Sequence, residues 1–212
     1  PNPPPQGGRG SAAGRGERDS PSPSRGEGRS GGGRSGAVAR HQLPVCSFLE
    51  PSLELVAAHG EPALAEAIAA AAPLLTWSAY DPYPRALIGA DFADGHGFAS
   101  LIGAGSYLAA ADFDLGLFLI APRVLYRDHR HAAPELYAPL TGPHAWRFRP
   151  GDPFIDKPAH APVWNEPWQP HATLVGAAAF LCIYCWTRDV AQPAEVIPAD
   201  DWGRYECTTS PR

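Results

Sequence analysis

The stretch HRHAAPELYAPLTG, residues 129–142, places two histidines, a glutamate and a tyrosine within nine positions, in a chain with eight histidines in all. Residues two apart on a β-strand point to the same face, so His129 and His131 can reach one ion. The AAP that follows can turn the chain, so that Glu135 starts a second strand beside the first. Tyr137 then shares the face of Glu135. Two imidazoles and a carboxylate suit a borderline divalent metal such as zinc, iron or nickel.

A further ligand has to come from a distant part of the chain. We expect it to be His171, which opens the last long strand in the stretch EPWQPHATL, residues 166–174. His160 is the alternative. The other histidines are expected to be structural or exposed: His41, His59, His96 and His144.

The first 44 residues differ in composition from the rest of the chain. They hold seven arginines and three acidic residues, and no aromatic residue precedes Phe48. Such a segment cannot bury enough apolar area to offset the entropy of ordering its backbone, so we expect a disordered tail over residues 1–44. The whole chain has 17 basic and 22 acidic residues, which leaves ten basic and 19 acidic residues for the remainder. This acidic remainder argues against nucleic acid as the main partner.

The remaining sequence divides into a helical part and a β part. Alanine and leucine recur at helical spacing after Pro62, which suits a first helical turn, and we expect helices over residues 49–58 and 61–73 within a helical segment, residues 45–92. From residue 97 onward, short apolar segments separated by Gly, Pro, Asp and Asn predict a β-sandwich or barrel. We place this barrel at residues 93–195 and a C-terminal extension at residues 196–212. From residue 97 onward the sequence contains neither a Gly-rich phosphate loop nor a GxSxG motif.

Location is indicated by the apolar stretches and the cysteines. The two longest apolar stretches, AEAIAAAAPLLTW and VGAAAFLCIYCW, are shorter than the roughly 20 residues that a membrane helix needs, and no secretory-signal pattern is present. Cys182 and Cys185 form a CxxC within a strand-like segment, where residues three apart point to opposite faces. We therefore expect reduced thiols, a cytoplasmic location and no membrane partner.

The spacing HxH-x3-E-x6-G, present as His129, His131, Glu135 and Gly142, resembles the first motif of the cupins, which are small β-barrels that hold a metal. Two departures stand out. Arg123 occupies the position, six before the HxH, where the motif often has glycine. The second cupin motif usually carries a glycine before its histidine, and here it reads EPWQPH.

Within the cupins, the stretch LYRDHRHAAPELYAPLTGPHAWRF, together with PHATL and IYCW, resembles the cupin-class dimethylsulfoniopropionate (DMSP) lyases over roughly residues 97–190. The resemblance implies a mainly β protein, with a single cupin double-stranded β-helix behind a helical segment. It implies one divalent transition metal, among zinc, iron, nickel and manganese, with ligands His131, Glu135 and His171 and with His129 next nearest. It further implies Tyr137 as catalytic base and Tyr126 as a second active-site tyrosine. Such barrels often pair, which makes a homodimer an expectation.

The reaction implied by the resemblance is a β-elimination that yields dimethyl sulfide and acrylate, carried out by a carbon–sulfur lyase on a small-molecule substrate. The pKa of free tyrosine is about 10, so its phenol is a poor base at neutral pH. A neighbouring divalent cation favours the phenolate, and this is how Tyr137 would act as the base. The positive sulfur favours aromatic faces, and Trp164, Tyr184 and Trp186 are the expected substrate-binding residues. Tyr126 differs in parity from the HxH pair, so it can join the site only if a bulge or bend lies near residue 127.

Two other functions fit the same pattern. Similar cupins act as dioxygenases or isomerases, which would keep the metal and change the reaction. A cupin can also bind a small molecule without turnover. The tyrosine beside Glu135 favours proton abstraction over oxygen chemistry.

Overall fold

The computed structural model describes residues 43–206, so the expected tail over residues 1–44 lies outside the described residues except for its last two positions. Residues 207–212, which include Cys207, also lie outside them. Among the described residues, no helix is long and apolar enough to cross a membrane.

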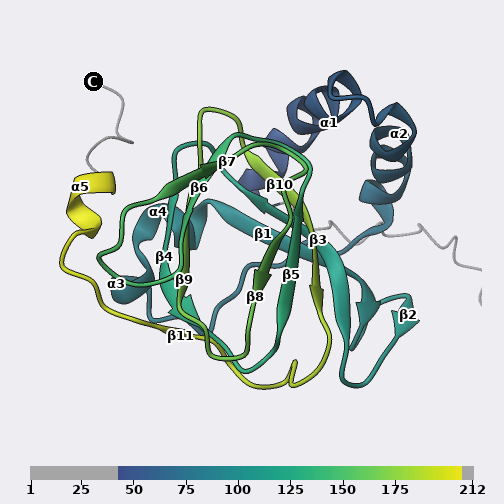
Figure 1. Ribbon diagram of the computed structural model, residues 1–212. Helices are drawn as coiled ribbons and strands as arrows, with labels where there is room; N and C mark the ends of the chain where they lie inside the picture. The colour runs from purple at the N-terminus through teal and green to yellow at the C-terminus, as the bar shows by residue number, and fades with distance from the viewer. Residues whose placement is uncertain (1–42, 207–212) are drawn as a thin grey trace, which may run out of the picture. The chain divides into compact units, whose positions relative to one another are not determined.

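Short helices come first and strands follow (Figure 1). The helical elements are η1 (Pro44–Phe48), α1 (Leu49–Ala58), α2 (Pro62–Ala71), η2 (Ala72–Leu74), α3 (Arg85–Ile88), α4 (Ala90–Asp94) and, near the end, α5 (Trp202–Glu206). The strands are β1 (His96–Gly103), β2 (Leu108–Ala109), β3 (Asp114–Ile120), β4 (Leu125–Arg130), β5 (Glu135–Pro139), β6 (His144–Arg147), β7 (Ile155–Lys157), β8 (Val163–Asn165), β9 (His171–Leu174), β10 (Phe180–Trp186) and β11 (Glu195–Val196).

The strands form two sheets, in the orders β2-β1-β3-β10-β5-β8 and β11-β4-β9-β6-β7. Apart from the β1–β2 pair, neighbouring strands run antiparallel. The chain passes back and forth between the sheets, so β4 and β5, which are consecutive, belong to different ones. This arrangement confirms the predicted mainly β, cupin-type barrel with helices on its N-terminal side. It places the HxH, which spans the end of β4, opposite the E-x-Y on β5.

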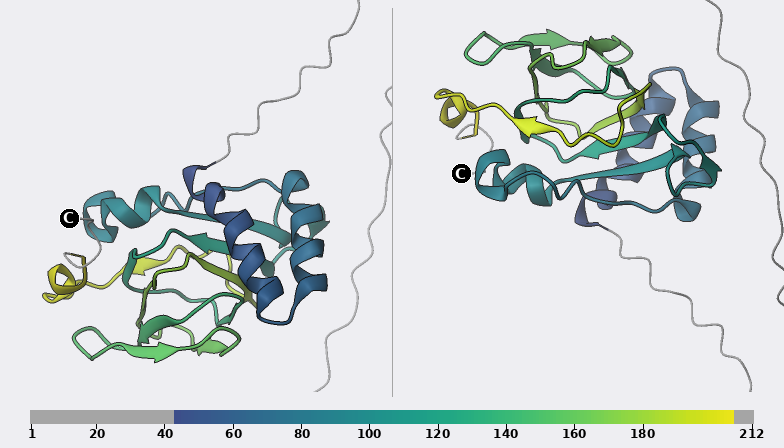
Figure 2. Two further views of the ribbon diagram at one scale, coloured as in Figure 1. Left: turned by 90° about the horizontal axis from the view of Figure 1, so that it is seen from above. Right: turned by 90° about the horizontal axis from the view of Figure 1, so that it is seen from below.

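The central strand β3 is apolar on both faces, and each face has its own core. Leu117 and Leu119 pack against α1 and α2 through Val56 and Ile68, so these helices cover the outer face of the six-stranded sheet (Figure 2). Phe118 and Ile120 alternate with them and point into the barrel, where they contact its aromatic core. The helices at 49–58 and 61–73 expected from the sequence are therefore present, with the second ending in the short 3₁₀ turn η2.

The five-stranded sheet carries a buried ion network on its outer face. Arg147 on β6 donates to Asp128 on β4 through Nε at 2.9 Å, and also donates to Asp201 through Nη1 at 2.6 Å. The indole of Trp202 in α5 donates to Asp128 at 2.7 Å. Because both charges of the Arg147–Asp128 pair are buried and paired, losing either partner would leave an uncompensated charge. The network fixes β4 from outside, immediately before His129 points inward.

The glycine of the first cupin motif is required by a close approach. A Cβ at Gly142 would lie 2.5 Å from the backbone nitrogen of Ala159, so no other side chain fits there without a shift of the backbone.

Arg123, at the position where the cupin motif often has glycine, adopts a φ of 62°. In this left-handed region a non-glycine residue is strained by about 1–2 kcal/mol, and a glycine costs about 0.5–1 kcal/mol more entropy on folding. We therefore expect Arg123→Gly to raise the free energy of unfolding by about 0.5–1 kcal/mol. Urea denaturation checks this, with Arg123→Ala, which keeps the strain, as the control. Equal stability of the two variants would contradict the explanation.

Candidate metal centre and active site

Three histidines from two strands meet inside the barrel. His129 lies on β4, His131 follows directly after this strand, and His171 opens β9, where it is the pairing partner of His129. One ring nitrogen from each lies within 4.8 Å of the others, and all three side chains are buried. The sequence alternative, His160, is exposed, and its ring packs edge-on against that of His59 with 6.0 Å between centroids. The structure therefore groups His171, and not His160, with the HxH pair.

The orientation of each imidazole is fixed by a backbone carbonyl. The Nδ1 atoms of His129, His131 and His171 lie 2.8–2.9 Å from the carbonyl oxygens of Arg127, Ala133 and Gln169. A ring nitrogen next to a carbonyl carries the proton, so the Nε2 atoms of His129 and His171 are left with free lone pairs. The Nε2 atoms of His129 and His171 are buried and have no hydrogen-bond partner. Buried unpaired acceptors are costly, and a cation would satisfy them. The residues therefore fit a divalent metal.

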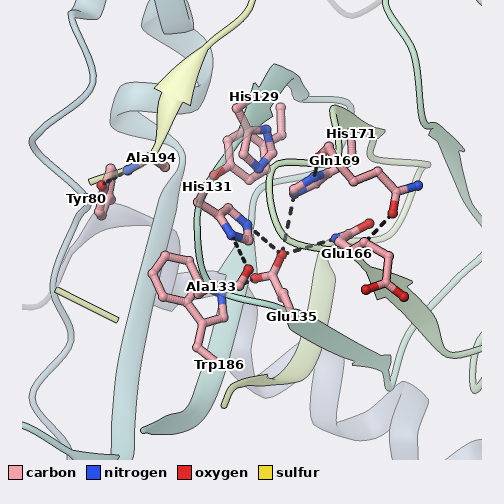
Figure 3. A network of polar contacts seen from close by, with 12 residues as sticks. Tyr80, His129, His131, Ala133, Glu135, Glu166, Gln169, His171, Trp186 and Ala194 are labelled. Carbon is pink, nitrogen blue, oxygen red and sulfur yellow. Dashed lines mark hydrogen bonds and ion pairs between the residues drawn. The ribbon is translucent and has the colours of Figure 1, made fainter. Parts of the chain in front are cut away.

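Glu135, the first residue of β5, supplies the carboxylate (Figure 3). Its Oε2 lies 3.1 Å from Nε2 of His131 and 3.4 Å from Nε2 of His171. Its Oε1 accepts a hydrogen bond of 2.6 Å from the indole of Trp186. Three imidazoles and one carboxylate thus converge from both sheets, which is a nitrogen-and-oxygen donor set suited to zinc and its first-row neighbours.

The pKa values of Glu135 and the histidines keep the carboxylate of the cluster ionised and His129 neutral. Burial raises the pKa of Glu135, but the nearby His131 and His171 outweigh burial and hold this pKa well below its usual value. Burial lowers the pKa of His131, but the charge of Glu135 raises it overall. His129 is different, because burial and the neighbouring imidazoles hold its pKa well below its usual value. His129 therefore stays neutral at neutral pH, as a metal ligand must be.

Two rows of paired residues on the inner face of the six-stranded sheet adjoin the cluster. In the first row Glu135 is opposite Trp186, and Trp186 is opposite Asp114 at the start of β3. In the second row Tyr137 is opposite Tyr184. Directly opposed residues of an antiparallel pair share a face, so all five side chains belong to one wall.

A cavity of about 220 Å³ opens in front of this wall. Glu135, Tyr137 and Asp114 line it together with Tyr80, Phe98, Phe118, Tyr184, Trp186 and Val190. The volume lies below the roughly 300–1,000 Å³ of drug-sized ligand sites, so the cavity suits a compact molecule, and its lining is largely aromatic. Tyr80 precedes the barrel in sequence, so the helical segment also contributes to the cavity.

Tyr137 is buried, and burial together with the charge of Glu135 holds its pKa well above 10. In the metal-free protein its phenol therefore stays protonated at neutral pH. A nearby positive charge would reverse this effect.

Tyr126 reaches the site through the expected irregularity of β4. The pairing of β4 with β9 shifts register between Tyr126 and His129, which is an irregularity of the kind that an inward-facing Tyr126 needs. The Tyr126 ring stacks on His129 at 3.8 Å between centroids, and its hydroxyl lies 2.9 Å from that of Tyr83.

The three predicted substrate-binding aromatics separate into two groups. Tyr184 and Trp186 line the cavity, and the Trp186 ring also lies 4.6 Å from that of His131. Trp164 on β8 does not line it: its side chain is 46% exposed and its indole donates to Glu166 at 2.8 Å. Strand alternation explains the difference, because Val163 and Asn165 point inward and the residue between them must point outward.

Two inward-facing residues of the site were missed by the sequence reading. Asn165 is fully buried and donates to Oε2 of Glu135 at 3.2 Å, while its own Oδ1 has no partner. The alternation of the VWN strand could have placed it on the inner face. Tyr83, which also packs edge-on against His129 at 6.0 Å, comes from a turn-rich link before the barrel. No local pattern in that link indicates a role.

A sequence profile of the dimethylsulfoniopropionate lyase family matches residues 33–182. The chain belongs to the DMSP lyase family. Its cupin barrel also resembles those of solved DMSP lyases. A chain from the crystal structures of the DMSP lyases RdDddP and RnDddQII is 22% identical, covers 74% of this chain and 80% of that chain, and has a TM-score of 0.60.

The DMSP lyase DddQ from Ruegeria pomeroyi DSS-3 is 23% identical, with coverage of 71% of this chain and 77% of that chain and a TM-score of 0.55. At these identities the structural likeness establishes the fold, and the family profile establishes DMSP lyase membership. No curated protein matches the sequence significantly.

Proposed function

We propose that this protein is a metal-dependent carbon–sulfur lyase that cleaves DMSP to dimethyl sulfide and acrylate by β-elimination. The observation that carries the proposal is the pair of buried, unpartnered Nε2 atoms of His129 and His171, beside Glu135 and the cavity that Tyr137 lines. Membership of the DMSP lyase family supports the substrate. The functional unit that we propose is the barrel, residues 93–195, with Tyr80 and Tyr83 of the preceding segment.

His129, His131, His171 and Glu135 would hold the metal, and zinc, iron, nickel and manganese are the candidates. When bound there, a divalent cation would act as a Lewis acid toward the substrate carboxylate and would favour the phenolate of Tyr137. Asn165 keeps the carboxylate of Glu135 in place through its amide. The carbonyl-anchored Nδ1 atoms keep the three imidazoles aimed inward, which is the usual role of such outer contacts.

Tyr137 acts as the base of the reaction. Its phenolate takes the proton from the carbon next to the substrate carboxylate. The electrons of that C–H bond form the C=C bond of acrylate, and the C–S bond breaks with its electron pair going to sulfur. The sulfur leaves as neutral dimethyl sulfide, so no general acid has to protonate it. The aromatic lining of the cavity limits access of water to the reacting atoms.

Purified protein, stripped of metal and then reloaded, tests the proposal directly. Incubation with DMSP should release dimethyl sulfide into the headspace and acrylate into solution in equal amounts, and chelated protein should release neither. Oxygen consumption is measured in parallel. Metal-loaded protein that produces no dimethyl sulfide, or that consumes oxygen as it turns substrate over, would contradict a DMSP lyase.

A further inference from the structure

Asp114 is a cavity-lining carboxylate without a cationic partner. It is half-buried at the start of β3, and no ion pair among residues 43–206 includes it. Its Oδ1 accepts a hydrogen bond of 3.0 Å from the hydroxyl of Tyr184, whose oxygen also lies 3.1 Å from Ser100 Oγ, and Ser100 is a second hydrogen-bond partner of the carboxylate. Burial raises the pKa of Asp114, because the carboxylate has lost water that nothing positively charged replaces.

The position of Asp114 relative to the metal cluster is set by strand pairing. Glu135, Trp186 and Asp114 lie in one row on three adjacent strands. Neighbouring strands are about 4.8 Å apart, so Asp114 and Glu135 are separated by roughly 10 Å across the cavity wall. Trp186 is the middle residue of this row, and its indole donates a hydrogen bond to Glu135.

This spacing matches a short zwitterion. Two methylene groups separate the carboxylate of DMSP from its sulfur, a distance on the order of 5 Å. With the substrate carboxylate beside the histidine cluster, its positive end reaches Trp186 and Tyr184 and lies next to Asp114. A partly desolvated carboxylate and aromatic faces both favour a cation there. None of the residues that line the cavity is basic, so no side-chain cation among them competes with the substrate for the carboxylate of Asp114.

We propose that Asp114 is a specificity-determining residue that binds the positively charged head of the substrate. It would discriminate against molecules of the same shape whose head is uncharged. The inference rests on the proposed function, because it takes the substrate carboxylate to bind at the metal. It predicts that the loss of Asp114 appears mainly in KM, since the positive charge on sulfur disappears as the C–S bond breaks.

Two ligands of equal shape and different charge test the inference without turnover. The ligand with a cationic head is 3-(trimethylammonio)propionate and its isostere with an uncharged head is 4,4-dimethylpentanoate; both carry the same carboxylate. Their dissociation constants are measured calorimetrically on zinc-loaded protein. Wild-type protein should bind the cationic ligand at least tenfold more tightly than the isostere. Asp114→Asn should lose this preference while it keeps the affinity for the isostere, which also shows that the variant is folded.

Asp156→Asn is the matched control, since it removes the same charge from an exposed residue on β7 that does not line the cavity. It should keep the wild-type preference. Wild-type protein that binds both ligands equally would overturn the inference, whatever the variant does. An unchanged preference in Asp114→Asn would also overturn it. Absence of dimethyl sulfide from the wild-type protein would count against the proposed function instead, because the binding comparison needs no reaction.

Discussion

Tyr137→Phe should lower kcat/KM for dimethyl sulfide release by about 10²–10⁴-fold, the usual contribution of a positioned general base. The ring remains and still packs against Trp146 and Phe180, so the fold should be retained. The hydroxyl alone is lost, and with it the group that takes the substrate proton. Headspace analysis under first-order conditions measures the effect.

The control for this prediction is Tyr107→Phe, which removes a hydroxyl from a side chain that is 82% exposed and outside the cavity. It should keep wild-type activity. Metal content should be the same in Tyr137→Phe and wild-type protein, because Tyr137 is not among the proposed ligands. Full activity in Tyr137→Phe would remove it as the base and leave the metal site untouched.

His171→Ala should weaken metal binding by more than about 100-fold and abolish lyase activity. Loss of a residue that merely orients a ligand already costs about 10–100-fold, and His171 is proposed as a ligand itself. His160→Ala is the matched control, because it makes the same substitution at the exposed histidine that the sequence left as the alternative. Competition with a chromogenic chelator measures both affinities.

Equal affinities in His171→Ala and His160→Ala would contradict the proposed ligand set. A loss of metal in His171→Ala with activity retained would separate catalysis from the metal. Either result is distinguishable from misfolding, which thermal denaturation of both variants detects.

The first cupin motif was readable from the sequence because its geometry is local. Strand alternation is enough to put His129 and His131 on one face and Tyr137 on the face of Glu135. The sequence stated the irregularity near residue 127 only as a condition for Tyr126 to join them, and the structure shows a register shift there.

Pairing across strands was harder to predict. His171 and His129 are partners in the β4–β9 pair, although 41 intervening residues separate them in the chain. Asp114 and Tyr83 enter the cavity region from elements without any local metal or substrate pattern. Their positions follow from how the strands and the preceding link fold together, which short-range periodicity does not contain.

The prediction that Trp164 binds the substrate failed because the sequence did not show which face of its strand the residue occupies. Its residue type favours a cationic substrate, but type alone does not fix the face of a short strand. The inner face of β8 belongs to Val163 and Asn165, so the tryptophan between them points outward.

The most direct measurement of the central idea is a crystal structure of the metal-loaded protein, with the ion located by anomalous scattering at its absorption edge. We expect one ion about 2.0–2.2 Å from the Nε2 atoms of His129, His131 and His171 and from a carboxylate oxygen of Glu135. We also expect this ion to border the cavity that Tyr137 lines. An ion bound elsewhere, or fully loaded protein with these four side chains unligated, would contradict this expectation.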